Sequence, residues 1–311
     1  MSSHRFFNKS SYLIILTILV FTLTACGSSE EVARTGQLEL RITDAPVDTA
    51  EAVVIRVASA TLHGPGGNTT FDVIDPNTNN IGRNIDLLQL QGGQWTGLFN
   101  NEVAAGHYSW IRLALDLNQS YIQINGAQHG LRCTSCENNG YRIVSSFDVE
   151  ADAVLTLMLD FDVRKSITDP NGSMPEYILR PTVRLMEATA SGSIAGTIDP
   201  SLITPVNGET NCSVYVFEGY DAQVDDIYIP VSQPVPANQN NPVSTAKVSN
   251  DGNNTYTASF LPAGNYSVSV TCDSVNDSAA DNDILNFSNP QNVSVNAGST
   301  AISDFPPASA P

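Results

Sequence analysis

Gly36-Gln37-Leu38-Glu39-Leu40-Arg41-Ile42-Thr43 alternates between polar and apolar side chains. Successive side chains of a β-strand point to opposite faces of its sheet, so a period of two indicates a half-buried strand. The same period recurs in three later runs: Ile111, Leu113 and Leu115; Leu155, Leu157, Leu159 and Phe161; Tyr177, Leu179, Val183 and Leu185. Turn residues separate these runs at 64–67, 92–93, 138–140 and 169–172. Because no helical spacing exceeds about two turns, the sequence predicts an all-β, mainly antiparallel fold.

The composition changes near residue 190. From Gly192 onward, Lys247 is the only basic residue against twelve acidic ones. Alternation nevertheless continues, because Cys212, Val214 and Val216 share one side of a predicted strand, and Val268, Val270 and Cys272 share one side of another. A change of composition without a change of periodicity predicts two β-sandwich domains in tandem, over 36–188 and 192–305, followed by a tail at 306–311.

A short internal echo links the two predicted domains. Val103-Ala104-Ala105-Gly106-His107-Tyr108-Ser109 matches Leu261-Pro262-Ala263-Gly264-Asn265-Tyr266-Ser267. Each segment is similar to the Ala-Gly-x-Tyr turn and strand of transthyretin-like sandwich modules, in which glycine permits the turn and tyrosine packs inward. The echo indicates that the two sandwiches are related.

The first 25 residues have the three parts of a secretory signal peptide: basic residues, an apolar stretch from Tyr12 to about Leu23, and small residues before a cysteine. Leu23-Thr24-Ala25-Cys26 resembles the lipobox of bacterial lipoproteins. That resemblance implies cleavage before Cys26 and acylation of its thiol, with palmitate among the acyl chains; the alternative is an ordinary secretory signal. Gly27 lacks the aspartate that retains many lipoproteins in the inner membrane, so the outer membrane is favoured. Residues 26–35 then form a flexible tether.

The charge balance excludes one class of partner. The chain has a formal net charge of −18, and beyond the signal peptide only 12 basic residues face 32 acidic ones. Nucleic-acid binding depends on basic clusters, so no nucleic-acid partner is expected. An acidic surface favours solubility, attraction of cations or tolerance of high salt.

The five cysteines fall into three groups by position: Cys26 for the lipid, a close pair at Cys133 and Cys136, and a distant pair at Cys212 and Cys272. Export would place the last four in an oxidising compartment, so two disulfides are predicted. The distant pair lies on the apolar sides of two strands, which meet either as neighbours or across two sheets. Two buried free thiols are the alternative.

Residues 36 to about 186 resemble a family of bacterial lipoprotein domains catalogued as domain of unknown function 4382. The resemblance rests on the opening strand with Thr43-Asp44-Ala45-Pro46, on Ile85-Asp86-Leu87-Leu88, on Ala105-Gly106-His107-Tyr108, and on Leu179-Arg180-Pro181. It implies no activity and no functional residues. The second domain is similar only in general terms to carboxypeptidase-regulatory-like sandwiches.

Single residues offer little catalytic chemistry. Asp44 before Pro46 could ligate a metal, but accepting hydrogen bonds from turn amides is the favoured role. Cys133-Thr134-Ser135-Cys136 could be a redox pair or half a zinc site, but its β-rich surroundings favour a structural loop staple. The three later histidines, His63, His107 and His129, lie near turn glycines, and no nucleophile elbow accompanies them. Asp160 and Asp162 alternate with Leu159 and Phe161, which predicts a solvated sheet edge.

Two features could bind ligands. Asp273, Asp277, Asp281 and Asp283 follow Cys272, and Asp221, Asp225 and Asp226 occupy an earlier loop. Loop carboxylates could hold calcium, which takes six to eight oxygen ligands, but their spacing fits no EF-hand, so a solvated acidic loop is the favoured interpretation. Trp95 could stack on a sugar ring or anchor a hairpin.

These observations predict a lipid-anchored envelope protein, facing the periplasm or the surface, that acts as a non-catalytic binding, adhesion or structural module. Its membrane contact would run through Cys26, and a protein or glycan partner is compatible with the sequence. The alternative function is an accessory subunit of an envelope enzyme or export system, which itself contributes no chemistry.

Overall fold

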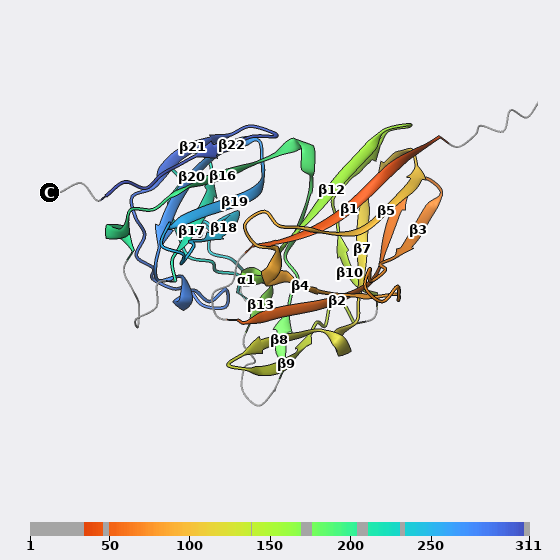
Figure 1. Cartoon of the computed structure of the whole chain (residues 1–311), viewed down its shortest axis with the longest axis horizontal. Helices are drawn as coiled ribbons and strands as arrows, with labels where there is room; N and C mark the ends of the chain where they lie inside the picture. The colour runs from red at the N-terminus through yellow and green to blue at the C-terminus, as the bar shows by residue number, and fades with distance from the viewer. Residues whose placement is uncertain are drawn as a thin grey trace, which may run out of the picture. The chain divides into compact units, whose positions relative to one another are not determined.

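The computed structural model describes residues 34–45, 50–137, 139–168, 176–203, 211–230 and 234–307. The predicted signal peptide, Cys26, most of the tether, Pro46 and the turn at 169–172 lie outside the described residues. All of the described residues belong to one compact unit, which is almost entirely β-structure (Figure 1). The predicted all-β fold is therefore confirmed. Within the described ranges there is no helix with the length and hydrophobicity that crossing a membrane requires.

Strand pairing divides this unit into two lobes. The N-terminal lobe contains β1 (Thr35–Ala45), β2 (Ala52–Gly64), β3 (Gly67–Asp72), β4 (Arg83–Asp86), β5 (Thr96–Ala104), β6 (Gly106–Tyr108), β7 (Trp110–Leu115), β8 (Tyr121–Ile124), β9 (Ala127–Arg132), β10 (Tyr141–Ile143), β11 (Phe147–Val149), β12 (Val154–Asp162), α1 (Val163–Ser166), β13 (Ile167–Thr168), β14 (Tyr177–Leu179) and β15 (Val183–Glu187). The C-terminal lobe contains β16 (Ser191–Thr197), β17 (Ser213–Glu218), β18 (Ser244–Lys247), β19 (Thr255–Pro262), β20 (Gly264–Thr271), β21 (Gln291–Val295) and β22 (Thr300–Ile302). Among the described strands, none pairs across the two lobes. The division into separate domains at about residue 190 stays a prediction.

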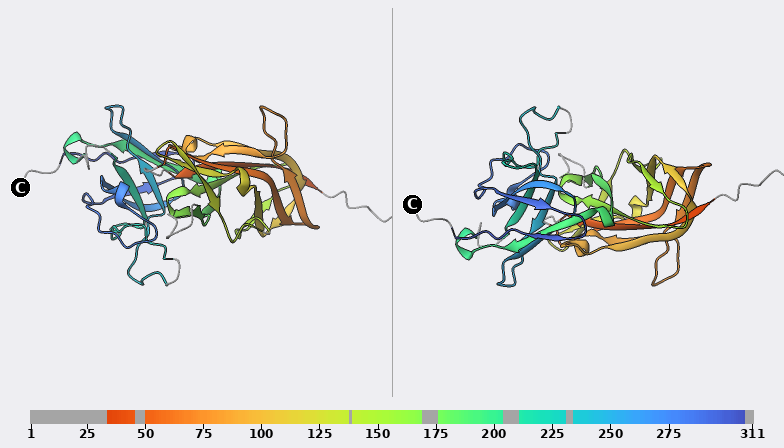
Figure 2. Two further views of the ribbon diagram at one scale, coloured as in Figure 1. Left: turned by 90° about the horizontal axis from the view of Figure 1, so that it is seen from below. Right: turned by 90° about the horizontal axis from the view of Figure 1, so that it is seen from above.

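Each lobe is a sandwich of sheets around its own core. In the N-terminal lobe, the sheet β15-β12-β1-β5 faces the sheet β10-β7-β2-β8-β9-β14-β13, on which β3 and β4 also pair with β2. Leu38, Leu40 and Ile42 fill the core from the first sheet, as their alternation predicts. In the C-terminal lobe, β19-β16-β22 faces β18-β17-β20-β21, and a separate core lies between them. Figure 2 shows the strands of both lobes from two further sides.

The opening strands of the two lobes pair in the same way. The first strand of each lobe, β1 or β16, pairs antiparallel with β5 or β19 and parallel with β12 or β22. The registers correspond, since Gly36 lies opposite Val103 and Gly192 lies opposite Leu261. A side chain at either glycine would collide with neighbouring backbone: a Cβ on Gly36 would lie 2.3 Å from the carbonyl oxygen of Glu150, and one on Gly192 would lie 2.3 Å from that of Asn296. The internal echo in the sequence therefore accompanies a strand pairing that both lobes share.

The echo itself forms the corner where the chain leaves one sheet for the other. Tyr108 and Tyr266 are buried just after this corner, and each hydroxyl donates to the carbonyl four residues earlier, that of Ala104 at 2.8 Å and that of Pro262 at 2.7 Å. The same bond is used in the tyrosine corners of other β-sandwiches. The same tyrosine hydrogen bond thus holds the sheet-to-sheet corner in both lobes.

The tyrosine bonds give a first testable prediction. Tyr108→Phe and Tyr266→Phe remove one hydroxyl each and leave a carbonyl without its donor, so each change is expected to lower the free energy of unfolding by about 1 kcal/mol. Urea unfolding followed by circular dichroism measures this loss. Tyr220→Phe provides the control, because Tyr220 is an exposed side chain and its change is expected to be neutral. Equal stability of all three variants and the parent would contradict a role for the corner bonds.

Candidate functional site

The chain turns sharply at the end of β12, and this turn sends two basic side chains toward the C-terminal lobe. Asp162 caps α1, because its Oδ1 accepts from the backbone N–H of Lys165 at 3.1 Å. Lys165 Nζ donates to the carbonyl of Pro242 at 2.7 Å and pairs with Asp162 Oδ2 at 2.7 Å. Both lobes therefore contribute partners to the same lysine.

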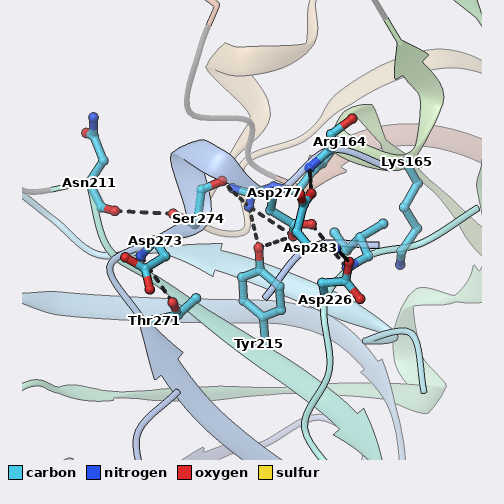
Figure 3. A network of polar contacts seen from close by, with 12 residues as sticks. Arg164, Lys165, Asn211, Tyr215, Asp226, Thr271, Asp273, Ser274, Asp277 and Asp283 are labelled. Carbon is cyan, nitrogen blue, oxygen red and sulfur yellow. Dashed lines mark hydrogen bonds and ion pairs between the residues drawn. The ribbon is translucent and has the colours of Figure 1, made fainter. Parts of the chain in front are cut away.

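Arg164 enters the C-terminal lobe more deeply (Figure 3). Its Nη1 donates to the hydroxyl of Tyr215 at 2.5 Å and to the carbonyl of Ser274 at 3.2 Å, and it lies 3.8 Å from Asp277 Oδ2. Tyr215 in turn donates its hydroxyl proton to Asp277 Oδ2. The side chains of Arg164 and Asp277 are 3% and 0% exposed. An arginine, a tyrosine and a carboxylate therefore form one buried polar chain between the lobes.

Asp277 belongs to a cluster of three carboxylates. Oxygens of Asp226, Asp277 and Asp283 lie within 4.8 Å of one another. Asp226 is fully buried and accepts from Gln239 Nε2 at 3.0 Å and from the backbone N–H of Asp283. Asp277 Oδ1 also accepts from the backbone N–H of Ile227 at 3.2 Å. Protein donors thus occupy all three carboxylates, since Asp283 accepts from the N–H of Ser278 at 2.8 Å.

Burial sets the protonation of this cluster. Desolvation raises the pKa of Asp277 to about 6, although the hydroxyl of Tyr215 and the charge of Arg164 act in the opposite direction. Desolvation also raises the pKa of Asp226, and its hydrogen bond from Gln239 opposes the rise. At neutral pH, the buried surroundings of Asp226 and Asp277 therefore disfavour the ionised forms of these carboxyl groups.

A pH prediction follows from Asp277. Its pKa is 3.8 ordinarily and about 6 in the folded protein, so between these values the folded state binds more protons than the unfolded state. Stability from this group is complete below about pH 4 and is lost as the pH rises through 6. The expected loss is at most about 3 kcal/mol, measured by urea unfolding between pH 4 and 7.

The matched control for this prediction is Asp277→Asn, which keeps the shape of the side chain and removes its titration. The difference in stability between the parent and this variant is expected to grow with pH up to about 6 and then to level off. A pH-independent difference would show that Asp277 does not titrate in this range.

The less favoured interpretation, calcium binding by the acidic loops, is only partly reflected in the structure. Of the four predicted residues, Asp277 and Asp283 converge, and they do so with Asp226 from the earlier loop. Asp273 lies apart beside Thr271 in Figure 3 and accepts from the backbone and side-chain N–H groups of Asn286 at 2.8 Å. Asp281 is not part of the cluster. Because protein donors already bond to all three carboxylates and Arg164 lies beside Asp277, these residues fit a buried polar network better than a cage of six to eight oxygens.

The favoured interpretation, a solvated acidic loop, is wrong for Asp226 and Asp277, because both side chains are buried. The loops that carry them cover the outer face of β17 and β20, where Tyr215 and Phe217 form a small second core with Ile227 and Ala279. The side chains of Asp226 and Asp277 lie beneath these covering loops, together with their hydrogen-bond donors. Periodicity alone could not reveal it, because loops supply the covering residues.

A second correction concerns Asp160 and Asp162, which the alternation placed on a solvated edge. Both are buried. Arg184 on β15 forms an ion pair with Asp160, and Lys165 forms one with Asp162. The outward face of β12 is therefore covered rather than solvated, and each buried carboxylate has a cation beside it.

Both predicted disulfides are present. Cys133 is joined to Cys136, and Cys212 is joined to Cys272. Ser213 lies opposite Thr271 in the antiparallel pair of β17 and β20, so the distant cysteines flank one register position on neighbouring strands. Of the two geometries that the sequence left open, the structure has the neighbouring-strand bridge.

The remaining predicted residues lie apart from the network. Asp44 is buried and accepts from the backbone N–H of Val163 at 3.2 Å, so it binds the first amide of α1. Trp95 is 44% exposed, and the guanidinium carbon of Arg41 lies 3.6 Å from its ring centroid. The histidines are dispersed, with His63 bonded to Asn68, His107 bonded to Asp148, and His129 packed edge-on against Tyr177.

The network contains two residues that the sequence analysis missed, Arg164 and Lys165. They are the only adjacent Lys or Arg residues in a chain with few basic residues, and they come two residues after the end of the buried strand β12. That combination is a usable signal, because a basic pair at the end of a buried strand has to find acidic or carbonyl partners nearby.

Comparison with known proteins adds a family for the N-terminal lobe. Residues 35–181 match the family "Domain of unknown function (DUF4382)". The DUF4382 region therefore spans most of the N-terminal lobe, from β1 to just beyond β14, and the resemblance stated from the sequence is confirmed for it. Arg164 and Lys165 lie inside the DUF4382 region, whereas Tyr215 and the three clustered carboxylates lie beyond it. No curated protein matches the chain in sequence.

Solved structures give weaker likenesses. The TIE protein of Bacillus anthracis is 11% identical, with a TM-score of 0.20 over 88% of this chain and 33% of its own, so this chain spans about a third of its length. The minor pilin GBS52 of Streptococcus agalactiae is 10% identical, with a TM-score of 0.20 over 88% and 98% of the two chains. BcpA, the major pilin subunit of Bacillus cereus, is 9% identical, with a TM-score of 0.20 over 87% and 69%. TM-scores of this size do not establish a shared topology.

Proposed function

We propose that the protein is a lipid-anchored envelope protein whose two joined sandwiches act as a non-catalytic binding or structural module. The observation that carries the proposal is the buried polar chain from Arg164 through Tyr215 to Asp277, which joins the lobes. A module that transmits position or load from an anchor needs such a joint, because separate domains on a flexible linker would move independently.

The surface chemistry supports the same proposal. His107 and Asp148 form a pair at 3.0 Å, but both side chains are more than half exposed, and the hydrogen bonds of the described residues bring neither a serine nor a cysteine to that pair. General base catalysis of acyl transfer requires a nucleophile within hydrogen-bond reach of the base. The geometry therefore favours contact surfaces over a catalytic centre.

The anchor is proposed from the lipobox-like Leu23-Thr24-Ala25-Cys26, and Gly27 favours the outer membrane. Its test is metabolic labelling of cells that express the full chain with radioactive palmitate. We expect the label on the mature protein, and we expect Cys26→Ser to abolish both the label and the recovery of protein with outer-membrane vesicles. A Cys26→Ser variant that keeps its label, or a parent protein that never acquires one, would overturn the anchor.

The contact role is tested separately by crosslinking intact cells and isolating the labelled protein. A reproducible crosslinked partner, or an envelope component retained with the parent protein and lost when the lobe joint is disrupted by Arg164→Met, supports it. Absence of any crosslinked component from correctly anchored protein would count against it.

A further inference from the structure

A group of cationic and aromatic side chains covers one outer face of the N-terminal lobe. Trp110 and Arg112 occupy the outward positions of β7, whereas Ile111 and Leu113 between and after them are buried. Arg142 on β10 lies directly opposite Arg112, and His63 on β2 lies directly opposite Trp110. These four residues, Trp110, Arg112, Arg142 and His63, are called the arginine–tryptophan face below.

Neither arginine of this face has an acidic partner among the described residues. Within the described residues, no ion pair or hydrogen bond involves the side chain of Arg112 or Arg142, and Nε of Arg112 is buried without an acceptor. Acidic residues outnumber basic ones more than twofold, and several other arginines of this lobe pair with them: Arg41 with Glu39, Arg56 with Asp116, Arg132 with Glu137 and Arg184 with Asp160.

The pairing of Arg112 with Arg142 is destabilising in isolation. Like charges directly opposite each other on neighbouring strands repel, and a buried donor without an acceptor has a desolvation cost. An external oxyanion offsets the repulsion, because it accepts from two guanidinium groups at once. The arrangement is therefore complementary to an anion supplied from outside the chain.

Trp110 holds the two guanidinium groups in place. The guanidinium carbons of Arg112 and Arg142 lie 4.8 and 5.9 Å from its ring centroid, within the range of cation–π attraction. His63 stacks on the same indole, with 5.0 Å between ring centroids and 4° between ring planes. A planar guanidinium that is already oriented matches the oxygen geometry of a phosphate group.

The position of this face indicates where the phosphate comes from. The backbone N–H of Ala105 donates to the carbonyl of Arg34 at 2.7 Å, so the start of the described chain lies at the corner that leads into β7. Trp110 is five residues beyond Ala105, about 16 Å along an extended strand. Figure 1 shows the start of β1 near β5 and β3, at this end of the lobe. Cys26 is only eight residues before Arg34, a reach of at most about 28 Å.

We propose that the arginine–tryptophan face docks onto the phosphate groups of anionic lipid headgroups in the membrane that holds the lipid anchor. This inference rests on the proposed anchor at Cys26. Tryptophan favours the headgroup region, and anionic lipid attracts basic side chains that lie close to the membrane surface. Docking would fix the orientation of the lobe on the membrane instead of leaving it to turn on its tether.

The chain has only two tryptophans, so fluorescence can report on this face. Full-length lipidated protein with Trp95→Phe leaves Trp110 as the sole indole. It is inserted into vesicles of phosphatidylcholine, with or without 30 mol% phosphatidylglycerol, that carry a nitroxide at the headgroup. We expect quenching of Trp110 to be greater in the anionic vesicles. Arg142→Gln is expected to lower the docked-to-undocked ratio about fivefold, and Arg112→Gln to have a similar effect.

Arg132→Gln is the matched control, because Arg132 is an exposed arginine of the same lobe outside this face. Its quenching is expected to equal that of the parent. Anchored protein whose Trp110 is quenched equally in both vesicle types, or in which Arg132→Gln and Arg142→Gln behave alike, would overturn the docking proposal. Protein that fails to remain with either vesicle would overturn the anchor instead.

A further arm separates a membrane from a soluble anion. Polygalacturonate and inorganic phosphate are added to detergent-solubilised protein, and the emission of Trp110 is followed. A response to polygalacturonate without quenching in anionic vesicles would assign the face to an acidic glycan and overturn docking on lipid. Because Arg142 is exposed, Arg142→Gln is expected to remain folded by circular dichroism even if Arg112→Gln does not.

Discussion

Arg164→Met is expected to lower the free energy of unfolding by about 3–5 kcal/mol, the usual effect of removing one partner from a buried ion pair. The arginine is almost completely buried and bonds to Tyr215, Ser274 and Asp277. Methionine fills a similar volume but leaves Asp277 without its cation, next to two further carboxylates. The loss therefore comes mainly from uncompensated charge rather than from a cavity.

Urea unfolding followed by circular dichroism measures this effect, and two further variants identify its source. Arg41→Met removes an ion pair whose side chains are partly exposed, so its expected cost is below about 1 kcal/mol. Adding Asp277→Asn to Arg164→Met is expected to restore on the order of 1–2 kcal/mol, because asparagine carries no charge. If the double variant is less stable than Arg164→Met, the unpaired charge of Asp277 is not what destabilises the single variant.

Removal of the bridge between Cys212 and Cys272 is the second large effect. Cys212→Ala with Cys272→Ala frees a loop of 60 residues in the unfolded chain, which corresponds to about 4 kcal/mol in the chain-entropy model. Cys212 is also buried in the core of the C-terminal lobe, so the loss of its sulfur removes packing contacts. Urea unfolding of the purified oxidised protein, compared with the double variant, tests this expectation.

The other disulfide is its natural comparison. Cys133 and Cys136 are only three residues apart, so the same model gives about 2 kcal/mol for the corresponding double alanine variant. Thiol titration of the denatured proteins confirms that each variant retains one bridge. If both double variants lose the same stability, loop length does not determine what these bridges contribute.

The strands were predictable because one face of each sheet is apolar. Leu38, Leu40 and Ile42 are all completely buried, as their alternation requires. The echo around Tyr108 and Tyr266 also predicted a repeat, because a sheet-to-sheet corner needs a particular glycine and tyrosine and thus leaves a local sequence signature. Local geometry of this kind can be read from one segment at a time.

The candidate site could not be predicted in this way. Asp160 reads as an outward, solvated residue on its own strand, and only Arg184 from a strand more than twenty residues later explains its burial. Asp226 and Asp277 come together from two loops fifty residues apart, and Arg164 approaches them from the other lobe. Such contacts depend on how separately formed layers cover one another, which the periodicity of a single segment does not record.

The parallel pairing of β1 with β12 has a mechanical consequence. Nine consecutive residues of β1, from Gln37 to Ala45, are in register with β12, and β5 pairs with the other edge of β1. A pull on the N-terminal end of β1, resisted by the C-terminal lobe beyond β12, would act along the strands. The hydrogen bonds between β1 and its neighbouring strands lie across that direction, so they would be loaded in shear. They would have to break together rather than one after another. Resistance to force is thus built into β1, the strand that follows the proposed tether.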